Sequence, residues 1–243
     1  MARLHEVAVR ELVAEIVSGR FVPGEWLPRE VDLAERFDIS RGVARECIRA
    51  LEERALVLVR HGQGAQVLEP QEWDVLDGVV AQEILRGPLP TTLLVEYLEC
   101  RQGLEIEAAG LAARRSSEQA RLALAAAYEA MTAAAGSANN ASAPDSEAEF
   151  LAADVRFHEA LAQASGNRVM TQTLLRMHSA LLCVRLPLAR PERRLDIGLP
   201  EHARILAAVE AGDEAAARQA MAAHLETIAG YVAEEVSRRD SFT

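Results

Sequence analysis

Four polar side chains lie on otherwise apolar helix faces in the second half of this 243-residue chain. Asp154 and His158 are one helical turn apart, and His202 and His224 each follow later among apolar neighbours. Burying a carboxylate and three imidazoles is costly unless they are paired or bound to a cation. Three nitrogens and one oxygen, with Asp154 and His158 as an i, i+4 chelating pair, suit a divalent transition metal. The pattern therefore predicts a metal site formed by these four residues.

Two alternatives accompany this prediction. A histidine on an apolar face is often a hydrogen-bonded core residue, and spacing alone does not separate His178, which lies among leucines, from the other three. A metal with an open coordination position can also activate water, so a metal-dependent hydrolase built in a helical bundle is the alternative function. Neither E-x-x-H nor H-E-x-x-H occurs in the sequence, which disfavours the di-iron and zincin classes of enzyme.

A second candidate site lies near the amino end, where Arg41, Arg45 and Arg49 follow Ser40 at steps of four residues. Residues at this spacing form one stripe along a helix. A guanidinium fork can bind guanine O6 and N7 together or clamp a phosphate. Arg45 is best placed for base edges, whereas Arg41 would share a phosphate with Ser40 at the helix start. Arg49 either contacts phosphate or pairs with a glutamate of its own helix, Glu46, Glu52 or Glu53.

The net charge of −11 disfavours nucleic-acid binding until it is divided along the chain. Residues 1–70 hold 10 arginines and 12 acidic residues, a net charge of −2, and within residues 40–60 five arginines face three glutamates. Screening at physiological salt limits the reach of a charge to about 8 Å. A local basic surface can therefore bind DNA on an acidic protein.

The elements around the arginine stripe predict a winged helix-turn-helix. Residues 5–18 have helical periodicity that ends at Gly19, residues 29–37 form a second short helix, and Ser40 is placed to cap the third. The segment "LVLVRHGQGAQVLE" then has two β-prone runs around a glycine-rich tip, which is typical of a hairpin. In a winged helix-turn-helix the third helix enters the major groove of DNA.

Helical periodicity continues through the rest of the chain, so the second domain is expected to be all-α and the protein mainly α. The predicted helices cover 74–86, 91–114, 117–135, 146–165, 168–186, 201–211 and 213–238. Residues 134–147, small and polar, predict a loop. The expected domains are a DNA-binding domain at 1–69, a linker at 70–75 and a helical dimerisation domain at 76–239.

The sequence predicts a cytoplasmic protein with no membrane partner. No apolar run approaches the roughly 18 residues of a membrane span, and the amino end lacks the apolar stretch of a signal peptide. Three cysteines lie far apart without C-x-x-C spacing, which fits a reducing compartment.

Residues 16–67 resemble the DNA-binding domain of the GntR family of bacterial transcription regulators. The segments "PGEWLPRE", "LAERFDISR", "ARECIRAL" and "GQGAQV" follow the family pattern P-G-x-x-L-P-x-E, L-A-x-x-(F/L)-x-(V/I)-S-R, V-R-E-A-(I/L)-R-x-L and G-x-G-x-x-V. The resemblance implies DNA contacts at five positions, which are Ser40, Arg41, Arg45, His61 and Gly62.

The sequence departs from this pattern at three places. Ala44 and Cys47 replace commoner residues on the core side of the third helix. Val31 stands where an arginine contacts DNA in the fatty-acid-responsive member of the family, and Arg29 is the candidate to replace that contact.

The second domain resembles the FCD effector domain found in the fatty-acid-regulator branch of this family. Many such domains hold a metal through D-x-x-x-H and two later histidines, a pattern supplied here by "DVRFH", "EHARIL" and "MAAHL". The resemblance thus selects Asp154, His158, His202 and His224 and leaves His178 outside the metal site. Zinc is the expected metal, with nickel or another transition metal as the alternative.

Two further residues are candidates for effector binding. Arg101 falls where this domain type carries an arginine, and an arginine beside a metal suits an organic carboxylate. Its alternative role is a salt bridge to Glu105 or Glu99. Asn167 is a second candidate, with a helix cap as its alternative role.

Together these observations predict a dimeric transcription regulator of repressor type that binds a palindromic operator in double-stranded DNA. A small organic acid at the metal-containing site would control it. We do not expect the protein to be an enzyme. The alternative function remains a metal-dependent hydrolase built in a helical bundle.

Overall fold

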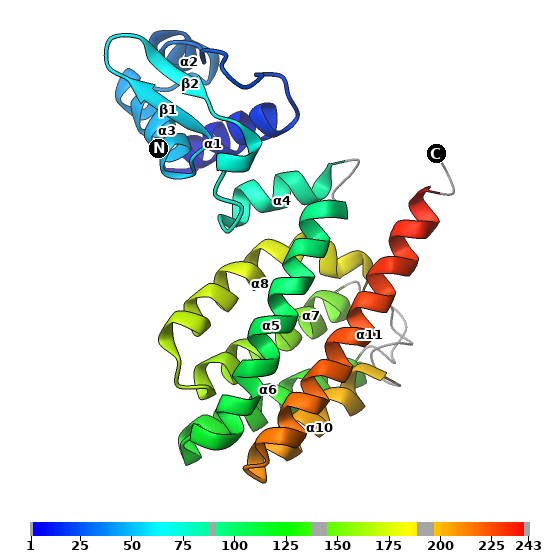
Figure 1. The fold of residues 1–243 in the computed structure, drawn as a ribbon. Helices are drawn as coiled ribbons and strands as arrows, with labels where there is room; N and C mark the ends of the chain where they lie inside the picture. The colour runs from blue at the N-terminus through cyan, green and yellow to red at the C-terminus, as the bar shows by residue number, and fades with distance from the viewer. Residues whose placement is uncertain (1, 88–90, 138–144, 189–196, 241–243) are drawn as a thin grey trace. The chain divides into compact units, whose positions relative to one another are not determined.

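A computed structural model describes residues 2–87, 91–137, 145–188 and 197–240. The chain divides into two compact units, residues 1–90 and 91–243 (Figure 1). The first unit contains three helices and a two-stranded hairpin followed by a short helix, and the second contains helices only among its described residues. The predicted fold class, a winged helix-turn-helix followed by an all-α bundle, is confirmed.

The first unit begins with α1 (Ala2–Val17), α2 (Glu30–Arg36) and α3 (Arg41–Glu53). The side chain of Ser40 accepts a hydrogen bond from the Val43 N–H at 3.3 Å, so the predicted cap of α3 is confirmed. One face of each helix is apolar, and these faces meet in a single core. The fully buried members of this core include Leu12, Ile16, Leu33, Leu51 and Leu56.

The wing consists of β1 (Val57–Arg60) and β2 (Gly64–Val67), which pair as antiparallel strands with Val57 opposite Val67 and Arg60 opposite Gly64. The valines at the base of the hairpin are buried in the core of the first unit, which attaches the wing to the helices. The tip of the wing is left exposed.

A 3-10 turn, η1 (Pro70–Glu72), leads to α4 (Gly78–Arg86). The side chain of Asp77 caps this helix by accepting hydrogen bonds from the N–H groups of Val79 and Val80. Val80 is buried in the core of the first unit. The structure thus groups α4 with the DNA-binding unit, whereas the expected boundary placed it in the second domain.

The described part of the second unit is built from helices. They are α5 (Thr91–Arg115), α6 (Glu118–Ser137), α7 (Asp145–Ala164), α8 (Arg168–Leu188), α10 (Leu199–Glu210) and α11 (Glu214–Asp240). Helix α7 packs against α5, α6 and α8, and α11 packs along α5 and α10 (Figure 1). The core of the second unit contains four buried side chains, Phe157, Leu161, Ile205 and Met221.

The predicted loop at 134–147 is shorter than expected, because α6 continues to Ser137 and α7 begins at Asp145. Residues 138–144 of that loop lie outside the described part of the chain. None of the described helices is long and apolar enough to cross a membrane.

Candidate metal centre and DNA-binding surface

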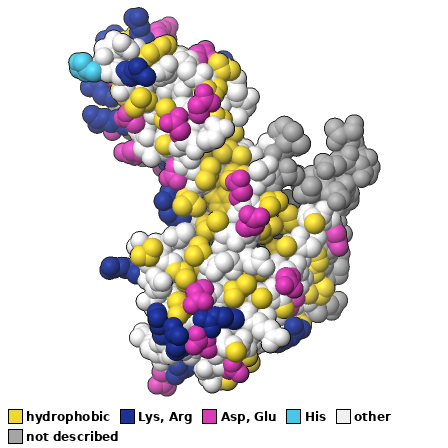
Figure 2. Space-filling view, viewed as in Figure 1, with side chains coloured by type: hydrophobic (Ala, Val, Ile, Leu, Met, Phe, Trp, Pro, Cys, Tyr) yellow, Lys and Arg dark blue, Asp and Glu magenta, His cyan; other side chains and the backbone are white. Residues whose placement is uncertain are grey.

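The arginine stripe predicted on the third helix is exposed on α3. The core side of that helix carries the buried residues Ala44, Cys47, Ile48 and Leu51. The other side carries the exposed residues Arg41, Arg45 and Arg49. Figure 2 shows basic side chains gathered along one edge of the first unit. Helix α3 therefore packs with one face and presents guanidinium groups with another.

Two of these arginines are paired with glutamates. Arg45 Nε lies 3.0 Å from Glu30 Oε1, and Arg49 Nη1 lies 2.9 Å from Glu46 Oε1. The Glu46 pair is one of the two roles expected for Arg49, and a phosphate contact remains a prediction. Glu30 carboxylate, through hydrogen bonds and then through charge, raises the pKa of Arg45.

The tip of the wing brings His61 and Gly62 to the surface. Gly62 has φ +75°, a left-handed conformation that favours glycine, and the turn closes with the Gln63 N–H donating to the Arg60 carbonyl at 3.0 Å. Arg29, the residue before α2, is also exposed.

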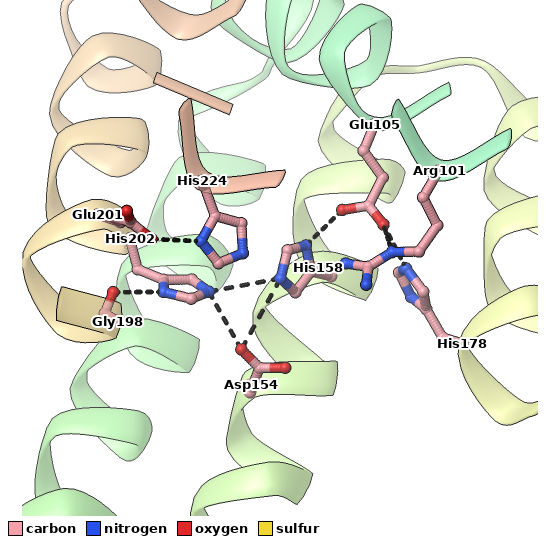
Figure 3. Close-up of polar contacts among 9 residues, drawn as sticks. All are labelled: Arg101, Glu105, Asp154, His158, His178, Gly198, Glu201, His202 and His224. Atoms are coloured by element: carbon pink, nitrogen blue, oxygen red, sulfur yellow. Dashed lines mark hydrogen bonds and ion pairs between the residues drawn. The ribbon is translucent and has the colours of Figure 1, made fainter. Parts of the chain in front are cut away.

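The four residues predicted to bind metal come together inside the second unit (Figure 3). Asp154 and His158 come from α7, His202 from α10 and His224 from α11. Asp154 Oδ1 lies 3.2 Å from His202 Nε2 and 3.8 Å from His158 Nε2, and the Nε2 atoms of His158 and His202 are 3.4 Å apart. Ligand atoms of the three buried histidines all lie within 4.8 Å of one another.

These separations fit a tetrahedral cation site. Metal–ligand bonds of about 2.0–2.1 Å place tetrahedral ligand atoms about 3.3 Å apart. Two distances in the cluster, 3.2 and 3.4 Å, lie close to that value, and a third is 3.8 Å. The donor set therefore suits zinc or another transition metal.

The Nδ1 atom of each of these histidines has an oxygen partner on the side away from the cluster. His202 Nδ1 donates to the Gly198 carbonyl at 2.7 Å, and His224 Nδ1 donates to Glu201 Oε2 at 2.9 Å. His158 Nδ1 lies 2.6 Å from Glu105 Oε2. A histidine that carries its proton on Nδ1 has the lone pair of Nε2 available for a metal, and such outer partners orient metal ligands in proteins.

Sequence reasoning missed the two glutamates of this outer set. Glu105 and Glu201 are buried, with 1% and 7% of their surface exposed. Glu201 precedes His202 on α10 and also accepts a hydrogen bond from Thr227 at 2.7 Å. The sequence did offer one signal for Glu105, which lies four residues after Arg101 on α5. That spacing predicts the ion pair with Arg101, but it does not predict the contact with His158.

Burial favours the neutral imidazoles of His158 and His224, whereas the nearby carboxyl of Glu105 is held ionised. Burial lowers the pKa of His158 to about 4, although Glu105 and Asp154 act in the opposite direction. Burial, followed by the charge of His202, lowers the pKa of His224. Burial disfavours the charged form of Glu105, but Arg101, His158 and His178 outweigh it and hold the pKa of this carboxyl well below its usual range.

Arg101 lies beside this cluster and is 3% exposed. Its Nε donates to Glu105 Oε1 at 2.5 Å, which is the alternative role expected for it. The same Glu105 oxygen lies 2.9 Å from His178 Nε2, so His178 belongs to this buried network (Figure 3). The charge of Arg101 is also one of the causes that lower the pKa values of His158 and His224. A contact between Arg101 and an effector stays a prediction.

Asn167 is the residue immediately before α8, and its side-chain oxygen accepts a hydrogen bond from the Met170 N–H at 3.2 Å. This is the capping role given above as the alternative. An effector contact by Asn167 stays a prediction.

Glu105, His158 and His178 form a second group whose ligand atoms lie close enough to hold a cation. Arg101 pairs with the carboxylate of this group, and His158 is shared with the first group. The group of three histidines with Asp154 is therefore the better metal site.

Comparison with known families divides the chain in the same way. Residues 4–67 match the family model described as bacterial regulatory proteins, gntR family, and residues 96–227 match the model for the FCD domain. The second match covers more than half of the chain.

Two curated relatives match over most of their length. The galactonate operon transcriptional repressor of Escherichia coli K12 is 32% identical over 207 residues, which cover 85% of this chain and 86% of the relative. The transcriptional regulator LutR of Bacillus subtilis is 31% identical over 91% of this chain and 99% of its own. A solved structure of Lar, described as controlling the Listeria monocytogenes agr system, has a TM-score of 0.67 at 17% identity, over 95% of this chain and 96% of its own, which supports the fold alone.

Proposed function

The chain belongs to the GntR family of bacterial transcription regulators, with an FCD domain that follows its DNA-binding domain in the sequence, and on this premise we propose that a small organic acid bound at a metal centre controls its affinity for DNA. The protein is a DNA-binding transcription regulator of repressor type. The proposal concerns four properties of this regulator, which are its metal, its effector, its dimeric state and the residues that contact DNA.

The convergence of three Nε2 atoms and Asp154 Oδ1 in the second unit carries this proposal. His158, His202 and His224 would hold the cation through Nε2, because each Nδ1 faces an oxygen. A cation bound there supplies a positive charge that attracts a carboxylate. We assign zinc to the site, with nickel or another transition metal as the alternative.

Arg101 supplies the second positive charge for the acid. Its Nε is held by Glu105, which leaves the terminal nitrogens of the guanidinium to grip a carboxylate. The name of the E. coli relative refers to galactonate, a sugar acid, which supports an organic acid as the class of effector.

On the DNA side, Arg45 reads a base edge and Arg41 with Ser40 binds a phosphate at the start of α3. His61 and Gly62 place the wing tip against the DNA backbone, and Arg49 and Arg29 add outer contacts. Seven exposed residues thus form the proposed DNA-binding surface, Arg29, Ser40, Arg41, Arg45, Arg49, His61 and Gly62.

Reading DNA with adequate selectivity requires two copies. One winged helix contacts only a few base pairs, and a two-fold pair reads both halves of a palindromic operator. We therefore propose a cytoplasmic homodimer. A metal-dependent hydrolase gains no support, because the relatives that match most of the chain are transcription regulators.

The proposal is tested by fluorescence anisotropy with labelled duplexes from the region upstream of the protein's own gene. Zinc-loaded protein is titrated into each duplex, with and without galactonate and a panel of other sugar acids. We expect one duplex to bind and one acid to release it, and we expect His202→Ala to abolish the response to the acid. Arg45→Ala should cost about 1–3 kcal/mol of discrimination at one base pair.

The matched control is His61→Ala, which also removes an imidazole but lies in the wing. It should weaken DNA binding and keep the response to the acid. An acid response that survives unchanged in both His202→Ala and chelated wild-type protein would contradict the metal centre as the effector site.

A further inference from the structure

Arg45 on α3 and Glu30 on α2 form a two-point contact between the helices of the DNA-binding unit. Arg45 Nε lies 3.0 Å from Glu30 Oε1 and 3.3 Å from Oε2, and Arg45 Nη2 lies 3.2 Å from Oε2. The two residues are 15 positions apart, so the packing of α2 on α3 creates the contact. Both side chains are accessible, with 58% and 39% of their surface exposed.

The contact uses only one edge of the guanidinium. Arginine has five N–H donors, one on Nε and two on each terminal nitrogen. Glu30 accepts from Nε and from Nη2, which leaves both donors of Nη1 and one donor of Nη2. These remaining donors form the second edge of the fork, and that edge can still bind guanine O6 and N7 together.

We propose that Glu30 is a positioning residue that fixes Arg45 in the orientation needed to read guanine, without itself contacting DNA. This inference rests on the proposed role of Arg45 as the base-reading residue. A carboxylate behind the fork restricts the rotamers of a long exposed side chain before DNA arrives, so less conformational freedom is lost on binding. It also offsets one positive charge, which weakens non-specific attraction to phosphate and leaves the hydrogen bonds to the base.

The opposite role for Glu30 is competition, in which the carboxylate must release Arg45 before DNA can bind. The two roles make opposite predictions for Glu30→Gln. If Glu30 positions Arg45, its loss reduces discrimination between the correct base and a wrong one. If Glu30 competes with DNA, its loss increases affinity for all sequences and leaves discrimination unchanged.

Glu46 provides a matched charge control on α3. It pairs with Arg49 at 2.9 Å and acts on Arg45 through charge alone. Glu46→Gln therefore removes the same negative charge near Arg45 without removing a hydrogen bond to it. Both variants should gain similar affinity for a scrambled duplex, and only Glu30→Gln should lose discrimination.

The experiment uses the full-length protein and a duplex from upstream of its own gene to which the wild type binds. Binding is measured to this duplex and to a set of copies, in each of which one guanine of one half-site is replaced by adenine. Wild type and Glu46→Gln should discriminate against the copy that changes the base read by Arg45. Glu30→Gln should lose about tenfold of that discrimination. In an Arg45→Ala background, Glu30→Gln should have no further effect on discrimination, because Glu30 acts through Arg45.

Three results would overturn the inference. They are full discrimination by Glu30→Gln, the same loss in Glu46→Gln, and an additional loss in the Arg45→Ala background, which would indicate a general effect on folding. Failure of the proposed function is distinguishable from these results, because the wild type itself would then bind no duplex selectively.

Discussion

Replacing Glu201 by glutamine should weaken metal binding although Glu201 is not itself a proposed ligand. Glu201 Oε2 accepts from His224 Nδ1 at 2.9 Å, and its other oxygen accepts from Thr227 at 2.7 Å. Burial raises the pKa of Glu201, but the hydrogen bonds from His224 and Thr227 outweigh it and hold the pKa below its usual range. The residue is therefore an ionised acceptor that keeps the His224 proton on Nδ1.

The size of the effect follows from this role. Removal of a hydrogen-bond partner behind a metal-binding histidine typically costs 10- to 100-fold in metal affinity. At 1.36 kcal/mol for each factor of ten, this is about 1.4–2.7 kcal/mol. The amide of glutamine can also donate to Nδ1 instead of accepting from it, which would move the imidazole proton to Nε2 and block the ligand atom.

The assay is a competition titration of zinc between the protein and a chromophoric chelator at neutral pH. Glu210→Gln is the control, because Glu210 is exposed on the same helix and loses the same charge. Equal zinc affinity in wild type and Glu201→Gln, or an equal loss in Glu210→Gln, would refute this reasoning about His224.

Three further predictions follow from other parts of the molecule. Burial lowers the pKa of His158 from 6.5 to about 4, so the unfolded chain takes up a proton first as the pH falls. The metal-free protein should therefore be fully stable above about pH 6.5 and lose about 3 kcal/mol between there and pH 4. Urea unfolding at a series of pH values checks this, and His158→Gln should remove that part of the slope. Arg41→Ala should weaken binding to all duplexes alike and reduce the salt dependence of binding by about one unit, whereas a change in base preference would contradict a phosphate contact. Ser40→Ala should lower the free energy of unfolding by about 1 kcal/mol, because the α3 cap is lost. Differential scanning calorimetry checks this, with Ser18→Ala as the control serine variant.

Local patterns in the sequence were enough to predict most elements and to identify candidate metal ligands on the helices. The apolar periodicity of residues 5–18 and the capping position of Ser40 are local features, and the corresponding helices formed. Asp154 and His158 are four residues apart, a spacing at which a helix places two side chains on the same face. The apolar faces around His202 and His224 marked these two as well, and the family resemblance separated them from His178.

The features that escaped prediction depend on contacts between distant elements. Glu105 meets His178 across 73 positions and Glu201 meets His224 across 23, so no local pattern joins these residues. Helix α4 has an amphipathic pattern, but amphipathicity does not say which unit its apolar face covers, and Val80 packs into the first. The pair of Arg45 with Glu30 was missed for the same reason.

Metal content is the most direct test of the account, because the proposed control of DNA binding depends on the cluster in the second unit. Full-length protein, purified without a histidine tag, is saturated with zinc, dialysed and analysed by elemental mass spectrometry, together with a His202→Ala variant shown by circular dichroism to be folded. We predict close to one zinc per wild-type chain and almost none in the variant. A folded wild type that retains no metal, or a variant that retains as much as the wild type, would contradict the central claim.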